Sequence, residues 1–189
     1  MRLILASASP RRRELLEMLS IDGLEIRPAK GEELPHPELT PPELVKALSA
    51  AKAAEIAAEY PDAVVIGADT VVSVDGTVLG KPKDEADAAA MLRLLSGRAH
   101  EVYTGVTVRQ GERVLSEAEG TAVHFRPMTE AEIAAYVATG EPLDKAGAYG
   151  AQGIGGLFVE RIEGDFFNVM GLPLCRLGRM LASFGVDLI

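Results

Sequence analysis

Short apolar runs that alternate with capped helical segments constrain the fold of this chain more than any other feature. Residues 2–6 and 63–68 have the length and composition of buried strands. Ser9-Pro10 follows the first run as a helix N-cap and first helical residue. Strands in alternation with helices predict an α/β fold, in which helices flank an elongated mixed β-sheet. We expect a two-lobed single domain over residues 1–189.

The remaining elements follow from the same signals. Capping boxes begin at Thr40 and Thr129, and the helices that they open run to about residue 59 and to a stop at Gly140. The strand at 63–68 is expected to end at Asp69-Thr70, and Asp75-Gly76 is a hairpin signal. Further strands are expected at 24–27, 71–74, 101–109, 113–125 and 157–162, further helices at 84–95 and 172–184, and loops at 31–42 and 144–156.

Charge and cysteine content narrow the possible partners. The net charge of −9 disfavours nucleic-acid polymers and anionic membranes, although a local cluster of cations still permits a small anionic substrate. The single cysteine excludes an internal disulfide and suits a reducing compartment. No apolar stretch is long enough for a signal peptide or a membrane span. We therefore expect a cytoplasmic protein.

Two segments early in the chain carry side chains suited to phosphate chemistry. Ser7 to Arg12 joins two hydroxyls and two guanidinium groups to a helix start, where free N–H groups attract anions. A capped helix with solvated arginines is the equally plausible alternative. Asp69 and Thr70 follow an apolar strand, and a carboxylate there can hold a metal or accept a proton from water. Taken alone, a turn-capping carboxylate is slightly favoured.

Two later segments add to these candidates. Gly80 and Pro82 flank Lys81 and restrict the backbone, although a surface lysine is the simpler explanation. The segment from Asp144 to Gly156 is rich in small residues that allow close approach of a ligand, and Gln152 offers the donor and acceptor that recognition of a base requires. The alternative is a flexible surface loop, and a long loop of this kind favours function.

Several other chemistries lack their motifs. No phosphate-binding loop of the G-x-x-x-x-G-K-[ST] type occurs, and the glycines of 150–156 precede a strand instead of opening a helix. The three histidines are scattered, which disfavours a zinc site. Cys175 is expected in the core on the apolar side of the last helix, and His100 is expected to be structural.

Taken together, the motifs resemble the Maf family of nucleoside triphosphate pyrophosphatases, also called septum-formation inhibitors. The matching segments lie in order along nearly the whole chain: Ser7-Ala8-Ser9-Pro10-Arg11-Arg12, Glu32, Lys52-Ala53, Gly67-Ala68-Asp69-Thr70, Leu79-Gly80-Lys81-Pro82, Asp144-Lys145-Ala146-Gly147-Ala148-Tyr149 and Gln152-Gly153. The resemblance implies a fold similar to that of inosine-triphosphate pyrophosphatases, cleavage between the α and β phosphates, a divalent cation such as Mg²⁺ or Mn²⁺, and a homodimer.

The resemblance also assigns roles to residues. Asp69 aligns with the family's general base, and Arg11, Thr70 and Gln152 align with its substrate-selecting positions, in the form found in the branch that acts on dTTP and UTP. Glu32 and Asp69 are the expected metal ligands, and either deprotonation of water or metal binding remains open for Asp69. Lys52, Lys81 and Glu32 are expected to be catalytic together with Asp69, the two lysines by neutralising the phosphates. The remaining expected substrate-binding residues are Ser7, Ser9, Arg12, Asp144 and Lys145.

One alternative function stays open at this point. A nucleotide-binding regulator of cell division needs the same cations but has no use for a carboxylate beside the phosphates. The predicted pair of Asp69 and Glu32 favours the hydrolase, which converts dTTP and UTP to monophosphate and pyrophosphate.

Overall fold

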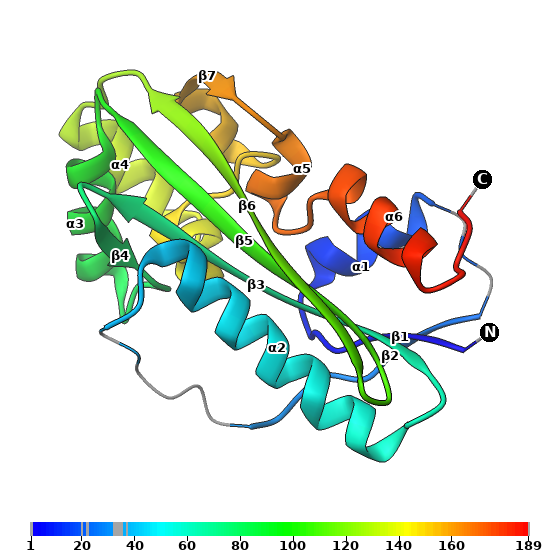
Figure 1. Ribbon diagram of the computed structural model, residues 1–189. Coiled ribbons are helices and arrows are strands. Elements are labelled where there is room, and N and C mark those ends of the chain that lie inside the picture. The colour runs from blue at the N-terminus through cyan, green and yellow to red at the C-terminus, as the bar shows by residue number, and fades with distance from the viewer. Residues whose placement is uncertain (1, 20, 22, 32–35, 37, 189) are drawn as a thin grey trace. The chain divides into compact units, whose positions relative to one another are not determined.

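A computed structural model describes residues 2–188 except 20, 22, 32–35 and 37 (Figure 1). The described residues form a seven-stranded sheet with the order β2-β1-β3-β5-β6-β7, and β4 pairs with β3. β1 lies parallel to β2 and β3, whereas the β3–β4 and β6–β7 pairs are antiparallel, so the sheet is mixed as predicted. The strands are β1 (Leu3–Leu5), β2 (Leu24–Ile26), β3 (Val64–Val74), β4 (Thr77–Leu79), β5 (Ala99–Gln110), β6 (Arg113–Phe125) and β7 (Val159–Glu163).

Three helices begin where the sequence places their caps. Ser9 accepts a bond from the Arg12 N–H at the start of α1, and Thr40 and Thr129 form the predicted capping boxes of α2 and α4. The α-helices are α1 (Pro10–Glu17), α2 (Pro41–Glu59), α3 (Glu85–Leu95), α4 (Glu130–Ala138), α5 (Phe166–Met170) and α6 (Leu174–Ser183), and 3-10 helices cover Glu141–Asp144, Ala146–Ala148 and Ile154–Phe158. None of the helices in the described ranges is long and apolar enough to cross a bilayer.

The chain divides into two compact units. Unit 1 comprises residues 1–69, 104–119 and 171–189, and unit 2 comprises residues 70–103 and 120–170. The expectation of one domain over residues 1–189 stays a prediction, and each unit is described by itself below.

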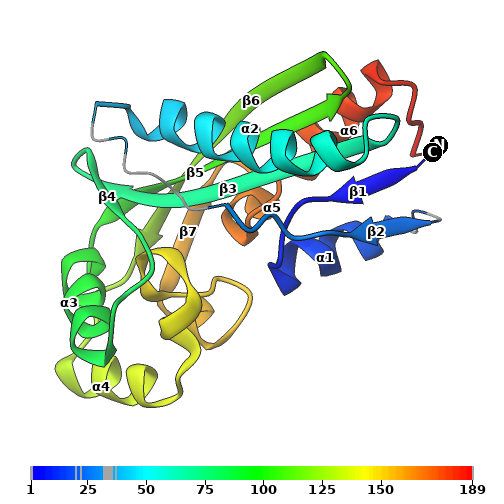
Figure 2. The ribbon, with the colours of Figure 1, turned by 90° about the horizontal axis from the view of Figure 1, so that it is seen from below.

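Unit 1 packs helices on both faces of its strands. Figures 1 and 2 show α2 on one face and α1 and α6 on the other. Side chains of a strand alternate between faces, and Ile4 and Val65 contact Ala53 and Ile56 of α2. Leu3, Leu5, Val64 and Ile66 are also buried, as are Leu15, Leu16, Leu177 and Leu181 of α1 and α6. Burial on both faces explains why these strands are apolar along their whole length.

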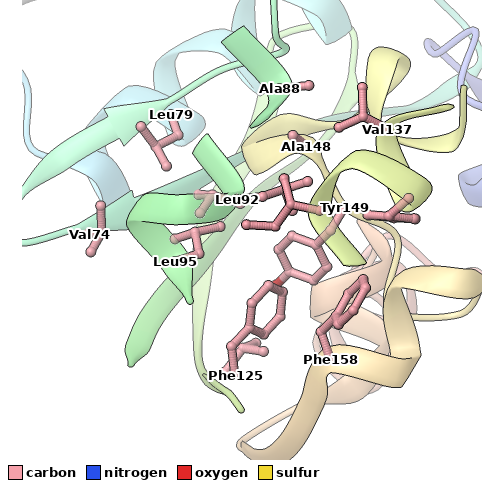
Figure 3. Close-up of a cluster of buried hydrophobic side chains, with 14 of the residues drawn as sticks. Val74, Leu79, Ala88, Leu92, Leu95, Phe125, Val137, Ala148, Tyr149 and Phe158 are labelled. Atoms are coloured by element: carbon pink, nitrogen blue, oxygen red, sulfur yellow. The ribbon is translucent and has the colours of Figure 1, made fainter. Parts of the chain in front are cut away.

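Unit 2 has a core rich in aromatic rings. Leu92 and Leu95 of α3 lie beside Phe125, Tyr149 and Phe158 (Figure 3). The rings of Phe125 and Tyr149 meet edge to face, with centroids 4.7 Å apart. Such contacts add specific geometry to the burial of apolar area, and they hold the segment before Gln152 against β6.

Several local features differ from the predictions. β3 continues through Asp69 and Thr70, so Asp69 lies inside a strand and not at its end. The last predicted strand begins at Val159 because residues 154–158 form a 3-10 helix, and α5 was not predicted because five residues show no clear helical period. Cys175 is exposed at the start of α6, outside the core.

Candidate functional site

Asp69 and Lys52 form a mostly buried ion pair in unit 1. Residues 65, 67 and 69 of β3 share one face by the two-residue period of a strand, and Val65 and Gly67 on that face contact α2. The Lys52 ammonium on α2 donates to Oδ1 of Asp69 at 2.5 Å. The two side chains are 21% and 12% exposed, so the pair is shielded from water and still accessible at its edge. The structure thus brings two predicted site residues together across 17 positions of sequence.

Two glycines allow α2 to approach the strands closely enough for this contact. A Cβ on Gly67 would lie 2.2 Å from the Ser49 carbonyl oxygen and 2.9 Å from the Ala53 nitrogen. A Cβ on Gly105 of β5 would lie 2.1 Å from the Val45 carbonyl oxygen. Both neighbours are helix backbone, which cannot rotate away as a side chain can. Gly67 belongs to the sequence motif Gly67-Ala68-Asp69-Thr70, but the motif does not reveal its packing role.

The predicted phosphate segment also assembles within unit 1. Ser7 Oγ accepts bonds from the Ser9 N–H and from Nη1 of Arg12, both at 3.2 Å. Nε of Arg12 donates to the carbonyl oxygen of Gly171 at 2.8 Å. Arg12 is buried. It links Ser7, just after β1, to Gly171, just before α6, and the sequence did not reveal this structural role. Arg11, in the first turn of α1, is partly exposed.

Two of the predicted segments of unit 2 lie side by side. Lys81 is exposed in the turn after β4, and the preceding Gly80 carbonyl accepts a bond from the Gly147 N–H at 3.0 Å. Lys145 Nζ donates to Asp144 Oδ1 and to the Glu141 carbonyl oxygen, each at 2.7 Å. The contact between Gly80 and Gly147 therefore places the Lys81 turn against the Lys145 segment.

Two further predicted positions of unit 2 differ in exposure. Thr70 on β3 is partly buried, and Gln152 is exposed in a turn of the glycine-rich segment. Within the segment expected as a loop at 144–156, residues 146–148 and 154–156 lie in short 3-10 helices, whereas residues 149–153 lie outside any helix or strand.

Among the described residues, the carboxylate of Asp69 is the predicted ligand for a divalent cation. The described residues contain no cluster of three or more His, Cys, Asp or Glu side chains suited to a metal. Glu32, the second predicted ligand, lies outside the described residues. Asp69 supplies the hard oxygen donor that Mg²⁺ and Mn²⁺ prefer, and Mg²⁺ characteristically uses only one or two protein carboxylates together with substrate phosphates and waters. The residue type at position 69 therefore fits such an ion.

His100 is structural, as predicted. Its ring packs edge to face on Phe125 and Tyr149, and its Nε2 lies 2.7 Å from the Tyr149 hydroxyl. Burial lowers the pKa of His100 to about 4, with a smaller contribution from His124. Burial also raises the pKa of Tyr149, so its hydroxyl keeps its proton. A neutral imidazole buried in an aromatic cluster is a packing residue.

Comparison with known proteins now identifies the family. The family model described as Maf-like protein matches residues 2–184. A dTTP/UTP pyrophosphatase of Moorella thermoacetica is 56% identical over 189 residues, covering 98% of this chain and 96% of that protein. One of the same name from Bacillus pumilus is 50% identical over 184 residues, covering 97% of each.

A solved structure supports the fold as well. The nucleoside-triphosphatase (dITP/XTP pyrophosphatase) of Mycobacterium abscessus aligns with a TM-score of 0.50 and 15% identity over 97% of this chain and 98% of that one. At that identity the likeness concerns the fold alone, and it agrees with the expected similarity to inosine-triphosphate pyrophosphatases. From its family model and its relatives, this chain belongs to the Maf family.

Proposed function

We propose that this chain hydrolyses dTTP and UTP to the monophosphate and pyrophosphate, and that a divalent cation bound at Asp69 takes part. The observation that carries the proposal is the identity of about half over nearly the full length with relatives named dTTP/UTP pyrophosphatase. The Lys52–Asp69 pair supports it chemically, because a shielded carboxylate next to a lysine combines the two charge types that phosphoanhydride hydrolysis uses.

The cations of the site neutralise a substrate with about four negative charges. Arg11, Lys52 and Lys81 come from separate segments of the chain and are proposed to contact phosphate oxygens. Ser7, Ser9 and the Arg12 guanidinium are proposed to orient the phosphates near the start of α1. Water attacks the α-phosphorus and pyrophosphate leaves, so the chain's main task is to position the reactants and stabilise charge.

Asp69 has two chemically distinct roles within this proposal. It either accepts the proton of the attacking water or holds the cation, with Glu32 as second ligand. A bound Mg²⁺ or Mn²⁺ would supply charge neutralisation and acidify water. Asp69→Asn keeps the shape of the side chain and removes its charge, so we expect it to lose most turnover while the fold remains. Near-wild-type turnover of that variant would exclude both roles.

Product identification tests the reaction itself. Purified protein is incubated with a panel of nucleoside triphosphates in the presence of Mg²⁺ or Mn²⁺. The nucleoside monophosphate and diphosphate are then separated, as are orthophosphate and pyrophosphate. We expect monophosphate and pyrophosphate, fastest from dTTP and UTP, and loss of turnover with a chelator. Binding of nucleotide without product release would instead support the regulator of cell division, the second function considered above.

Gln152 is proposed to read the pyrimidine edge through its amide. Gln152→Glu replaces a donor with a second acceptor, so we expect it to slow dTTP and UTP hydrolysis more than it weakens phosphate binding. Equal loss for every nucleotide in the panel argues against base reading by this side chain.

Two further parts of the proposal concern the state of the protein. A cytoplasmic location is supported by the single cysteine, and a homodimer is supported by the family resemblance. Fractionation of cells that express the chain tests the location, and light scattering on the purified protein tests the dimer.

A further inference from the structure

The turn that carries Gln152 is built around the carboxylate of Glu141. Oε2 of Glu141 accepts the Ile154 N–H at 2.9 Å, and Oε1 accepts the Gly155 N–H at 3.0 Å. The Tyr136 hydroxyl donates to Oε1 at 2.7 Å. One side chain from the start of a 3-10 helix thus satisfies two consecutive backbone donors just beyond Gln152.

The glycines of this segment fit closely around the same two side chains. A Cβ on Gly153 would lie 2.5 Å from Oε2 of Glu141, and a Cβ on Gly155 would lie 2.5 Å from the Tyr136 hydroxyl oxygen. The sequence predicted that small residues here let a ligand approach the backbone. The structure shows that Gly153 and Gly155 let Glu141 and Tyr136 approach it.

Gln152 lies between two anchored points of the backbone. The Gly150 N–H donates to the Tyr136 hydroxyl at 3.1 Å, and the Gly153 N–H closes a turn on the Gly150 carbonyl at 3.2 Å. Ile154, two residues after Gln152, is held by Glu141. The backbone on both sides of Gln152 therefore depends on the Tyr136–Glu141 pair, although neither residue belongs to the predicted site.

Charge strengthens this arrangement. Burial opposes ionisation of Glu141, but the bonds from the Gly155 and Ile154 N–H groups and from Tyr136 outweigh it, and the pKa of Glu141 is lowered. Near neutral pH the carboxylate is ionised, and hydrogen bonds to an ionised acceptor are roughly twice as strong as neutral ones.

We propose that Glu141 is a positioning residue for substrate selection, whose carboxylate holds the turn around Gln152 in the conformation that discriminates between bases. The proposal rests on the proposed function, because it requires Gln152 to read the base. The discrimination between dTTP and dCTP, which differ in the group at the 4-position and in the 5-methyl group of the ring, then depends on Glu141 without contact between Glu141 and substrate.

Glu141→Gln tests this role with little change of shape. The amide nitrogen replaces one oxygen and faces a backbone donor, so either Ile154 or Gly155 loses its acceptor. We expect the ratio of kcat/KM for dTTP to that for dCTP to fall about tenfold or more, the order expected when a charge-assisted hydrogen bond is lost. The concentration of folded enzyme cancels in this ratio, so a loss of stability alone leaves it unchanged.

Glu132→Gln is the matched control in the same unit. Glu132 accepts bonds from the Thr129 N–H at 2.8 Å and from Nη2 of Arg126 at 2.8 Å, so its replacement also removes a charged acceptor of backbone and side-chain bonds. We expect it to lower the melting temperature and to leave the dTTP/dCTP ratio at the wild-type value.

Tyr136→Phe provides a second variant that keeps the ring packed on Phe158, whose centroid is 5.2 Å away. It removes the acceptor of Gly150 and should lower the ratio in the same direction, and it decides alone if Glu141→Gln does not fold. A wild-type ratio in the folded variants overturns the inference and leaves the proposed function intact. Absence of pyrophosphate release from dTTP and UTP by the wild-type chain refutes the proposed function itself.

Discussion

Gly67→Ala is expected to damage stability and turnover together, because Gly67 seats α2 against β3. The added Cβ would lie 2.2 Å from the Ser49 carbonyl oxygen and 3.0 Å from the Ala53 Cβ. Restoring ordinary contact distances requires α2 to retreat by roughly 1 Å. Overpacking of this kind costs about 1–3 kcal/mol of unfolding free energy. The helix carries Lys52 with it, so the contact with Asp69 lengthens, and a displacement of that size can reduce turnover about 100-fold.

Gly105→Ala separates the two effects. Its Cβ would lie 2.1 Å from the Val45 carbonyl oxygen, two helical turns before Lys52. The steric cost is similar, but the displacement is centred farther from the ion pair. We therefore expect a comparable loss of unfolding free energy and a smaller loss of kcat than in Gly67→Ala.

Gly178→Ala on α6 is the control for the chemical change itself. A Cβ at Gly178 meets nothing within 4 Å, and alanine is favoured over glycine inside a helix by about 0.5–1 kcal/mol, so we expect a gain in stability. Because the chain has no tryptophan, urea unfolding is followed by far-UV circular dichroism, and turnover by pyrophosphate release. Wild-type stability and turnover in Gly67→Ala would refute the argument that backbone contact positions Lys52.

Two further predictions concern buried polar groups. The pKa of His100 is about 4 in the folded chain and near 6.5 in the unfolded chain. Between pH 4 and pH 6.5 the unfolded state therefore binds a proton at His100 that the folded state does not bind. Stability should fall by about 3 kcal/mol as pH drops from 6.5 to 4, and His100→Gln, which retains a partner for the Tyr149 hydroxyl, should remove that slope in urea titrations at stepped pH. Arg12→Lys keeps the charge but cannot make both bonds to Gly171 and Ser7. We therefore expect a loss of about 1–3 kcal/mol in unfolding free energy. An unchanged urea midpoint would show that these two bonds do not contribute to stability.

The sequence predicts elements well where signals are local. Caps at Ser9, Thr40 and Thr129 locate three helix starts because the cap bonds lie within a few residues of one another. The prediction that a strand ends at Asp69 is wrong for a physical reason. A carboxylate is disfavoured inside a sheet that is covered by helices, and the group that offsets its burial, Lys52, comes from a helix that is distant in sequence.

For the site residues as well, contacts between neighbours in sequence could be predicted, whereas contacts between residues distant in sequence could not. Ser7, Ser9 and Arg12 are joined by hydrogen bonds because they share one strand-to-helix turn, and their role in binding phosphate stays a prediction. Glu141 was missed because nothing near it in sequence indicates which backbone donors its carboxylate meets. The glycines at 153 and 155 carry the available signal, since each marks a position where another atom comes close, but glycine alone does not say which atom.

Substitutions are expected to have different effects in the two units, because the carboxylates of Asp69 in unit 1 and Glu141 in unit 2 have different partners. In unit 1, the two-residue period of β3 places Gly67 and Asp69 on one face of the strand. The contact between Gly67 and α2 therefore determines both the packing of α2 and the position of Lys52. Changes there should reduce stability and turnover in parallel. In unit 2, Glu141 acts on the backbone around Gln152. If Gln152 reads the base as proposed, a change there is expected to alter which base is accepted while the Lys52–Asp69 pair stays intact, so base preference and turnover should respond to different substitutions.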